Sequence, residues 1–292
     1  MSRAFPEVAG VEHSYVDAAG LRTHVAQAGR GDPVLLLHGW PQHWYAWRGV
    51  IPPLAENFRV IAPDLRGFGW TDAPRFGYEK ETLAADVIAL LDELEIEKVK
   101  LVGHDWGGWI SYLLCMLYPH RVERYVALNI AHPWPQSDPS DLLRLWRFAY
   151  QWVLMTPGVG TTILRNWPQV VDAMIKNCGG PKDTWTDAEL REFSEVLQEP
   201  ERARASAKLY GAFQTKEMIP IIRGRYSDRR LAVPTLNLHG VGDPVITPDS
   251  LGGIDERADD YTLELIEGAG HFIAEDQPEL VAQRVAEFFS QS

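Results

Sequence analysis

Short, almost uninterrupted apolar runs constrain the fold of this chain more than any other feature of its sequence. They occupy residues 34–37, 58–62, 99–102, 125–128, 235–238 and 261–266. Runs of this kind, without polar alternation, are typical of strands buried on both faces in a parallel sheet. Residues 12–16 and 21–28 precede them and predict a hairpin that turns at Ala18-Ala19-Gly20.

Helical patterns separate several of these runs. Leucines and a valine recur at helical spacing over residues 83–94, residues 109–116 form an apolar helix, and residues 280–289 form a last one. Strands alternating with helices predict an α/β fold, with a mostly parallel sheet covered by helices on both faces. With 292 residues, the chain is long enough for one large α/β domain or for a core with one insertion.

The alternation breaks between residues 133 and 228. This stretch contains several helical segments and no clear buried strand. One helix begins near Ser140 and runs to Tyr150, and another follows a capping box formed by Thr186 and Glu189. We therefore expect a core made of residues 1–132 and 229–292, and a helical lid made of residues 133–228. An insertion after a strand lies over the edge where open α/β sheets bind ligands.

The strongest local motif is Gly103-His104-Asp105-Trp106-Gly107, which joins a buried strand to a helix. This is the pattern of a nucleophile elbow, with Asp105 where hydrolytic enzymes more often have serine. The glycines fit because the turn is tight and strained. A carboxylate suits attack on saturated carbon, since attack on an acyl group would give an unstable anhydride. The alkyl ester formed this way must then be hydrolysed by an activated water.

A base and its orienting acid can be assigned by position. His271 follows the last strand through a glycine-rich loop, and Asp243 follows the strand before it. The order Asp105, Asp243, His271 is the nucleophile–acid–base order of α/β-hydrolases. The acid can also follow the strand after the elbow helix, but this chain has Asn129 there. We predict that Asp105 is the nucleophile, His271 the base and Asp243 its partner.

Ester hydrolysis also requires an oxyanion hole. The expected donors are the main-chain N–H groups of Trp106, next to the nucleophile, and of Trp40, in the loop His38-Gly39-Trp40-Pro41. Each such donor accelerates the reaction by about a hundredfold or more. We also expect Trp40 and Trp106 to contact the substrate, and His38 and His104 to serve as structural hydrogen-bonding residues.

These motifs together resemble the soluble epoxide hydrolases of the α/β-hydrolase family. The matching strings are residues 38–48, 64–69, 103–108, 242–244 and 270–271, so the resemblance covers nearly the whole chain. In the lid, residues 148–152 and 205–210 resemble the segments carrying that family's two tyrosines, here Tyr150 and Tyr210. The resemblance implies hydrolysis of a small epoxide by water to a vicinal diol. A tyrosine O–H is a suitable proton donor to the leaving oxygen, and Tyr226 and Tyr45 are the fallback candidates.

Two other functions stay open at this point. A haloalkane dehalogenase shares the Asp nucleophile and the His base, and the indole N–H groups of Trp40 and Trp106 would suit a departing halide. Such enzymes usually have Asn or Glu after His-Gly, however, and do not need the lid tyrosines. A non-catalytic ligand-binding protein of the same fold would not need Asp105, Asp243, His271 and both tyrosines together. An esterase is disfavoured because the elbow has no serine.

Composition and charge limit the kinds of partner that this chain can bind. The formal charge of −12 and the lack of a basic cluster argue against a nucleic-acid partner. We expect no metal and no cofactor, because no ligand cluster or phosphate-binding loop occurs. The first ten residues lack the apolar run of a signal peptide, and no apolar stretch is long enough to span a membrane. We therefore expect a cytoplasmic protein. The sequence is compatible with a homodimer.

Overall fold

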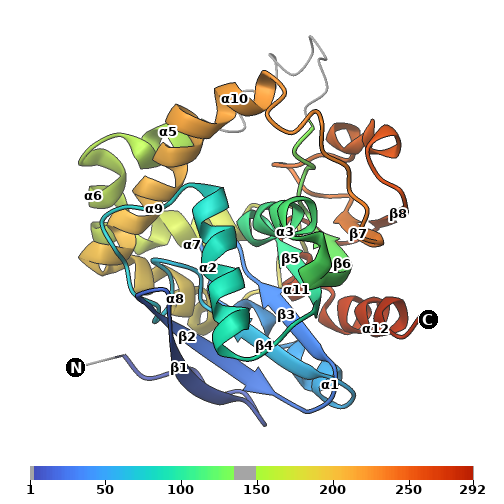
Figure 1. Cartoon of the computed structure of the whole chain (residues 1–292). Coiled ribbons are helices and arrows are strands. Elements are labelled where there is room, and N and C mark those ends of the chain that lie inside the picture. The colour runs from blue at the N-terminus through green and yellow to red at the C-terminus, as the bar shows by residue number, and fades with distance from the viewer. Residues whose placement is uncertain (1–2, 135–148, 292) are drawn as a thin grey trace.

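A computed structural model describes residues 3–134 and 149–291. Eight strands form one sheet in the order β1-β2-β4-β3-β5-β6-β7-β8 (Figure 1). The first three strands in this order, β1, β2 and β4, pair antiparallel, and all pairs from β4 onward to β8 are parallel. The mostly parallel sheet predicted from the apolar runs is confirmed. The strands are β1 (Glu12–Ala18), β2 (Leu21–Ala28), β3 (Pro33–Leu37), β4 (Arg59–Pro63), β5 (Val99–His104), β6 (Val122–Leu128), β7 (Thr235–Gly240) and β8 (Tyr261–Ile266).

One expectation about the strands is wrong. The central strands β5 and β7 are buried at every residue, but β8 is not buried on both faces. Leu263 and Leu265 in β8 are 39% and 49% exposed. The reason is position, because β8 is the last strand of the sheet and has no strand on its outer side.

The core helices form two packed pairs. Helix α2 (Lys80–Glu93) packs on α3 (Trp106–Leu117), and α1 (Ile51–Ala55) packs on α12 (Pro278–Phe289). The short helix α11 (Ile273–Asp276) precedes α12. The predicted helices at 83–94, 109–116 and 280–289 are confirmed with small differences at their ends.

Among the described residues, no helix has the length and apolarity needed to cross a membrane.

The stretch between β6 and β7 is helical in its described part and forms a separate layer next to the core (Figure 1). Helix α9 lies at its centre and packs on α5 and α6. The capping box is confirmed: the Thr186 side chain accepts from the Glu189 N–H, and the Glu189 carboxylate accepts from the Thr186 N–H. The lid helices are α5 (Ala149–Met155), α6 (Val159–Asn166), α7 (Pro168–Lys176), α8 (Asp187–Ser194), α9 (Pro200–Ala212) and α10 (Met218–Ile222), with a π-helical turn, η5 (Phe213–Glu217), before α10.

Part of the lid prediction is not tested. The helix expected from near Ser140, with its apolar residues Leu142, Leu143 and Trp146, lies outside the described residues. The boundaries at residues 133 and 228 likewise stay predictions. We use "lid" below for the described helices α5 to α10.

Candidate active site

Asp105 occupies the turn between β5 and α3. Its backbone has φ = +50° and ψ = −122°, a conformation that is strained for any residue other than glycine. The turn also brings main chains very close together. A Cβ on Gly107 would overlap the carbonyl oxygen of Leu37, and one on Gly39 would overlap the Asp105 side chain. The elbow therefore requires glycine at positions where the sequence places it, and it holds the Asp105 carboxylate at the N-terminus of α3.

One oxygen of this carboxylate is held by the loop after β3. The Trp40 N–H donates to Asp105 Oδ1 over 2.9 Å. A donor in this place would also stabilise negative charge on Oδ1 if Asp105 became an ester and water attacked its carbonyl carbon. Within the described structure, no hydrogen bond joins the Trp106 N–H to this oxygen, so its share in the oxyanion hole stays a prediction.

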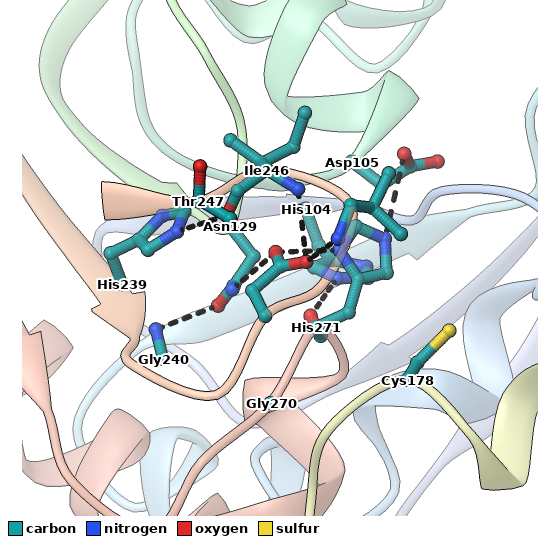
Figure 2. A network of polar contacts seen from close by, with 12 residues as sticks. His104, Asp105, Asn129, Cys178, His239, Gly240, Ile246, Thr247, Gly270 and His271 are labelled. Atoms are coloured by element: carbon teal, nitrogen blue, oxygen red, sulfur yellow. Dashed lines mark hydrogen bonds and ion pairs between the residues drawn. The ribbon is translucent and has the colours of Figure 1, made fainter. Parts of the chain in front are cut away.

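The structure brings the three predicted catalytic side chains together from three strand ends. His271 Nδ1 lies 2.8 Å from Asp243 Oδ2, and His271 Nε2 lies 3.7 Å from Asp105 Oδ2. Figure 2 shows His271 directed toward Asp105 from its own loop. Asp243 and His271 are both buried. The arrangement gives one imidazole a carboxylate on each ring nitrogen.

Asp243 is held as a carboxylate by four donors. Its Oδ1 accepts from the N–H groups of Val245 and Ile246, and its Oδ2 accepts from His271 and from the Asn129 amide at 2.8 Å. Burial alone would raise the pKa of Asp243. The charge of His271 and these hydrogen bonds outweigh burial, so that the pKa falls below its ordinary value.

Asn129 is a site residue that sequence reasoning considered only as a replacement for the acid. It follows β6, accepts from the Gly240 N–H at 3.2 Å and orients its amide N–H toward Asp243 (Figure 2). The signal was present in the sequence, because the ends of neighbouring parallel strands meet at one edge. An amide at the end of β6 could therefore be expected to reach the residue that follows β7.

The main chain of His271 is fixed on both sides. Its carbonyl accepts from His104 Nε2 at 2.7 Å. Burial lowers the pKa of His104 to about 4, so this ring is neutral and fits the structural role expected for it. The His271 N–H donates to the carbonyl of Cys178, a lid residue, at 2.8 Å. His38 makes comparable structural bonds, with Nε2 accepting from the Leu65 N–H at 3.0 Å.

The lid segment Cys178-Gly179-Gly180 packs main chain to main chain on the loops that carry the acid and the base. A Cβ on Gly179 would overlap the carbonyl oxygen of Gly242, next to Asp243. A Cβ on Gly270, next to His271, would overlap the Cys178 carbonyl oxygen and the Gly180 nitrogen. In the sequence, Gly179-Gly180-Pro181 is typical of an ordinary break between helices, and nothing in it indicates this contact.

The electrostatics of His271 follow from its two carboxylate neighbours. Burial would lower its pKa by disfavouring the imidazolium. The charges of Asp243 and Asp105 more than offset burial and raise the pKa of His271 well above its ordinary value. The protonation of His271 therefore depends on whether Asp105 is charged.

The two predicted lid tyrosines face each other at this site. The rings of Tyr150, on α5, and Tyr210, on α9, have centroids 5.7 Å apart and are nearly perpendicular. Trp40 packs on both, at 6.1 Å and 5.5 Å, and Trp106 packs on Tyr210 at 5.6 Å. Burial is the main cause that raises the pKa of both phenols, and the charge of Asp105 adds to it. Both tyrosines are therefore held in the neutral, proton-donating form.

The fallback tyrosines have other contacts. The Tyr226 hydroxyl donates to Glu81 at 2.8 Å, and Tyr45 packs on Phe193. The indole groups of the two site tryptophans also differ. Trp40 Nε1 donates to the Ser206 hydroxyl at 3.1 Å, whereas the polar neighbour of the buried Trp106 indole is the Tyr210 hydroxyl.

Comparison with known proteins agrees with this fold. The sequence pattern of the alpha/beta hydrolase fold matches residues 32–157. The soluble epoxide hydrolase of Corynebacterium sp. (strain C12) is 29% identical over 293 residues, covering 96% of this chain and 98% of the relative. Epoxide hydrolase 4 of Homo sapiens is also 29% identical over 293 residues, covering 96% of this chain and 79% of the relative. The solved structure of the epoxide hydrolase CorEH without ligand has a TM-score of 0.83 at 27% identity, covering 96% of this chain and 99% of that one.

The chain therefore has the α/β-hydrolase fold, and it is a hydrolase. Its resemblance to proteins named epoxide hydrolases extends over nearly its full length, as the sequence motifs predict.

Proposed function

We propose that this hydrolase converts epoxides to vicinal diols through an alkyl ester on Asp105. The observation that carries the proposal is the pairing of two kinds of group around one carboxylate. Asp105 stands in place of the usual serine, with two neutral phenols on its lid side and the His271–Asp243 pair on its core side. A carboxylate nucleophile with proton donors for a leaving oxygen suits the opening of a strained ether.

In the first half-reaction, the free Asp105 oxygen attacks one epoxide carbon. The bond from that carbon to the ring oxygen breaks, and the departing alkoxide takes a proton from Tyr150 or Tyr210. Trp40 holds the other Asp105 oxygen at 2.9 Å, which orients Oδ2 toward the substrate. The product of this step is a neutral hydroxyalkyl ester.

In the second half-reaction, water attacks the ester carbonyl. Esterification removes one of the two negative charges that raise the pKa of His271, so that its imidazole can accept a proton from water. Asp243 stabilises the resulting imidazolium, and the Trp40 N–H stabilises the oxyanion. The diol leaves with an oxygen that came from Asp105 Oδ2. Water supplies two protons in this step: the one taken up by His271 passes to the alkoxide oxygen that leaves Asp105, and the one lost from the new carboxyl group restores the phenol, so the cycle consumes one epoxide and one water.

The dehalogenase alternative has weaker support. A departing halide needs N–H donors, but the Trp40 indole N–H is already bonded to Ser206, and the Trp106 indole has the Tyr210 hydroxyl as its polar neighbour. Two buried phenols would also have no task in halide release. We therefore favour proton donation to oxygen over hydrogen bonding to a halide.

The proposal is tested by offering styrene oxide, a fatty-acid epoxide and a haloalkane in parallel, with Asp105→Ala as the control. We expect a diol from at least one epoxide and none from the control. Halide release without diol would identify a dehalogenase instead. Binding without turnover of any of the three compounds would support the ligand-binding alternative and contradict the proposal.

A further inference from the structure

Lys80, the first residue of α2, has a completely buried side chain, which is rare for lysine. Its ammonium lies 3.1 Å from Glu217 Oε2, and its main-chain N–H donates to Glu217 Oε1 at 2.8 Å. Glu217 ends the π-helical turn η5 of the lid. One residue of the core is thus joined to the lid by an ion pair and a main-chain hydrogen bond.

The same ammonium contacts two residues next to the active site. It donates to the carbonyl of Leu209, the residue before Tyr210, at 2.8 Å. It also lies over the ring of Trp106, the residue after Asp105, 4.5 Å from the ring centroid. Phe213, the first residue of η5, packs on the same Trp106 ring at 4.9 Å. Lys80 therefore touches the neighbours of both the nucleophile and one of the two proton donors.

Stability alone gives little reason for this arrangement. Replacing a buried ion pair by apolar side chains of similar size is often neutral or stabilising, because both charges lose their hydration. Burial indeed lowers the pKa of Lys80 to about 8, against the opposing charges of Glu217, Glu79 and Asp105. Single π-helical turns also occur frequently at functional sites. The features that distinguish this pair are its contacts with Leu209 and Trp106.

We propose that Lys80 is a positioning residue for epoxide opening, and that its ammonium fixes Tyr210 and Trp106 relative to Asp105. This role rests on the proposed function. Opening requires Tyr210 to reach the leaving oxygen while Asp105 attacks, and small errors in such a geometry slow a reaction strongly. The described contacts of Lys80 do not include Asp243 or His271. Its contact with Trp106 is to the indole ring and not to the main-chain N–H that is the predicted oxyanion donor, so ester hydrolysis should proceed without it.

The test separates the two half-reactions. Rapid-quench experiments with styrene oxide, read by intact-protein mass, give the rate at which the Asp105 ester forms and the rate at which it disappears. Lys80→Met alone leaves the Glu217 carboxylate buried without its cation, which can destabilise the fold. The double variant Lys80→Met/Glu217→Gln removes both charges. Lys216→Met is the matched control, because Lys216 lies in the same turn and forms an exposed ion pair with Glu79.

We expect ester formation to slow by about ten- to a hundredfold in both Lys80 variants, with ester hydrolysis unchanged. The control should leave both rates at the wild-type value. If the double variant formed the ester at the wild-type rate, the proposal would be overturned, since Lys80 would then serve only to neutralise Glu217. Equal slowing of both steps would overturn it as well, by indicating a general distortion. A wild-type protein that forms neither ester nor diol would disprove the proposed function itself, and this role with it.

Discussion

The core half and the lid half of the site are held in different ways. In the core, hydrogen bonds fix each group: Asp243 accepts four, and the main chain of His271 is bonded on both sides. In the lid, Tyr150 and Tyr210 are placed mainly by packing between aromatic rings, and their polar contacts are to each other, to Trp106 and to the Gln151 amide, which donates to the Tyr150 hydroxyl over a long 3.5 Å. The core half is therefore the more sharply fixed of the two.

The difference corresponds to the two half-reactions. Ester hydrolysis repeats the same geometry for every substrate, because water always attacks the same carbonyl, and a rigid set of hydrogen bonds suits it. Epoxide opening must accommodate substrates of different shape, and ring packing permits some adjustment. We therefore expect changes that disturb Asp243 and His271 to affect hydrolysis of the ester, and changes that disturb Tyr150 and Tyr210 to affect its formation.

The largest effect should come from the base in the core. In His271→Gln, turnover should fall by roughly 10⁴-fold or more, while ester formation continues because it needs only Asp105 and the phenols. Intact-protein mass spectrometry with a reactive epoxide should show a gain equal to the mass of the substrate, located on the peptide containing Asp105. The double variant Asp105→Ala/His271→Gln is the control and should gain nothing. An unmodified His271→Gln protein would contradict the division between core and lid.

The next largest effect should come from the lid phenols. Tyr150→Phe and Tyr210→Phe should each slow epoxide opening. In the double variant, the rate of opening should fall by about 10²–10⁴-fold, which is the usual contribution of a general acid. Single-turnover kinetics should show slow ester formation followed by hydrolysis at the normal rate. Tyr226→Phe removes a phenol bonded to Glu81 outside the site and serves as the control. A folded double variant with wild-type turnover would contradict the assignment of the two tyrosines as proton donors. It would favour a haloalkane dehalogenase instead.

A smaller effect should mark where the lid touches the core. Gly179→Ala places a Cβ against Gly242 and should slow ester hydrolysis by about ten- to a hundredfold through displacement of Asp243 and His271. Gly158→Ala is the matched control, because its φ of +79° is close to the +87° of Gly179, but its Cβ would meet open space. Each substitution should cost about 1 kcal/mol of backbone strain, which thermal unfolding can measure. Equal effects on hydrolysis in the two variants would assign the loss to strain and not to the contact.

The sequence predicts the core half better than the lid half, for a physical reason. Local patterns identify the buried strands, the elbow glycines and the groups that follow each strand, and a parallel sheet then brings those groups to one edge. This argument yields Asp105, Asp243 and His271 as neighbours. It fails for β8, whose apolar residues do not indicate that the strand lies at the edge of the sheet.

Contacts between distant segments leave no such local pattern. The Gly179–Gly180 pair looks like an ordinary helix break, and Lys80 looks like a solvated residue at the start of a helix. Their meaning depends on how the lid is placed on the core, which hydrophobic periodicity does not encode. The two tyrosines were found only through their resemblance to a family, since nothing in their spacing distinguishes them from the other eight tyrosines of the ten in the chain.

The central claim is that Asp105 attacks carbon and becomes an ester, and oxygen labelling tests it most directly. A single turnover by excess wild-type protein in ¹⁸O-water should give a diol without label, because its new oxygen comes from Asp105. The label should instead appear in the peptide containing Asp105, since water attacks the ester carbonyl. If Asp105 acted only as a base on water, the first diol formed would carry the label and Asp105 would carry none. That result would contradict the account.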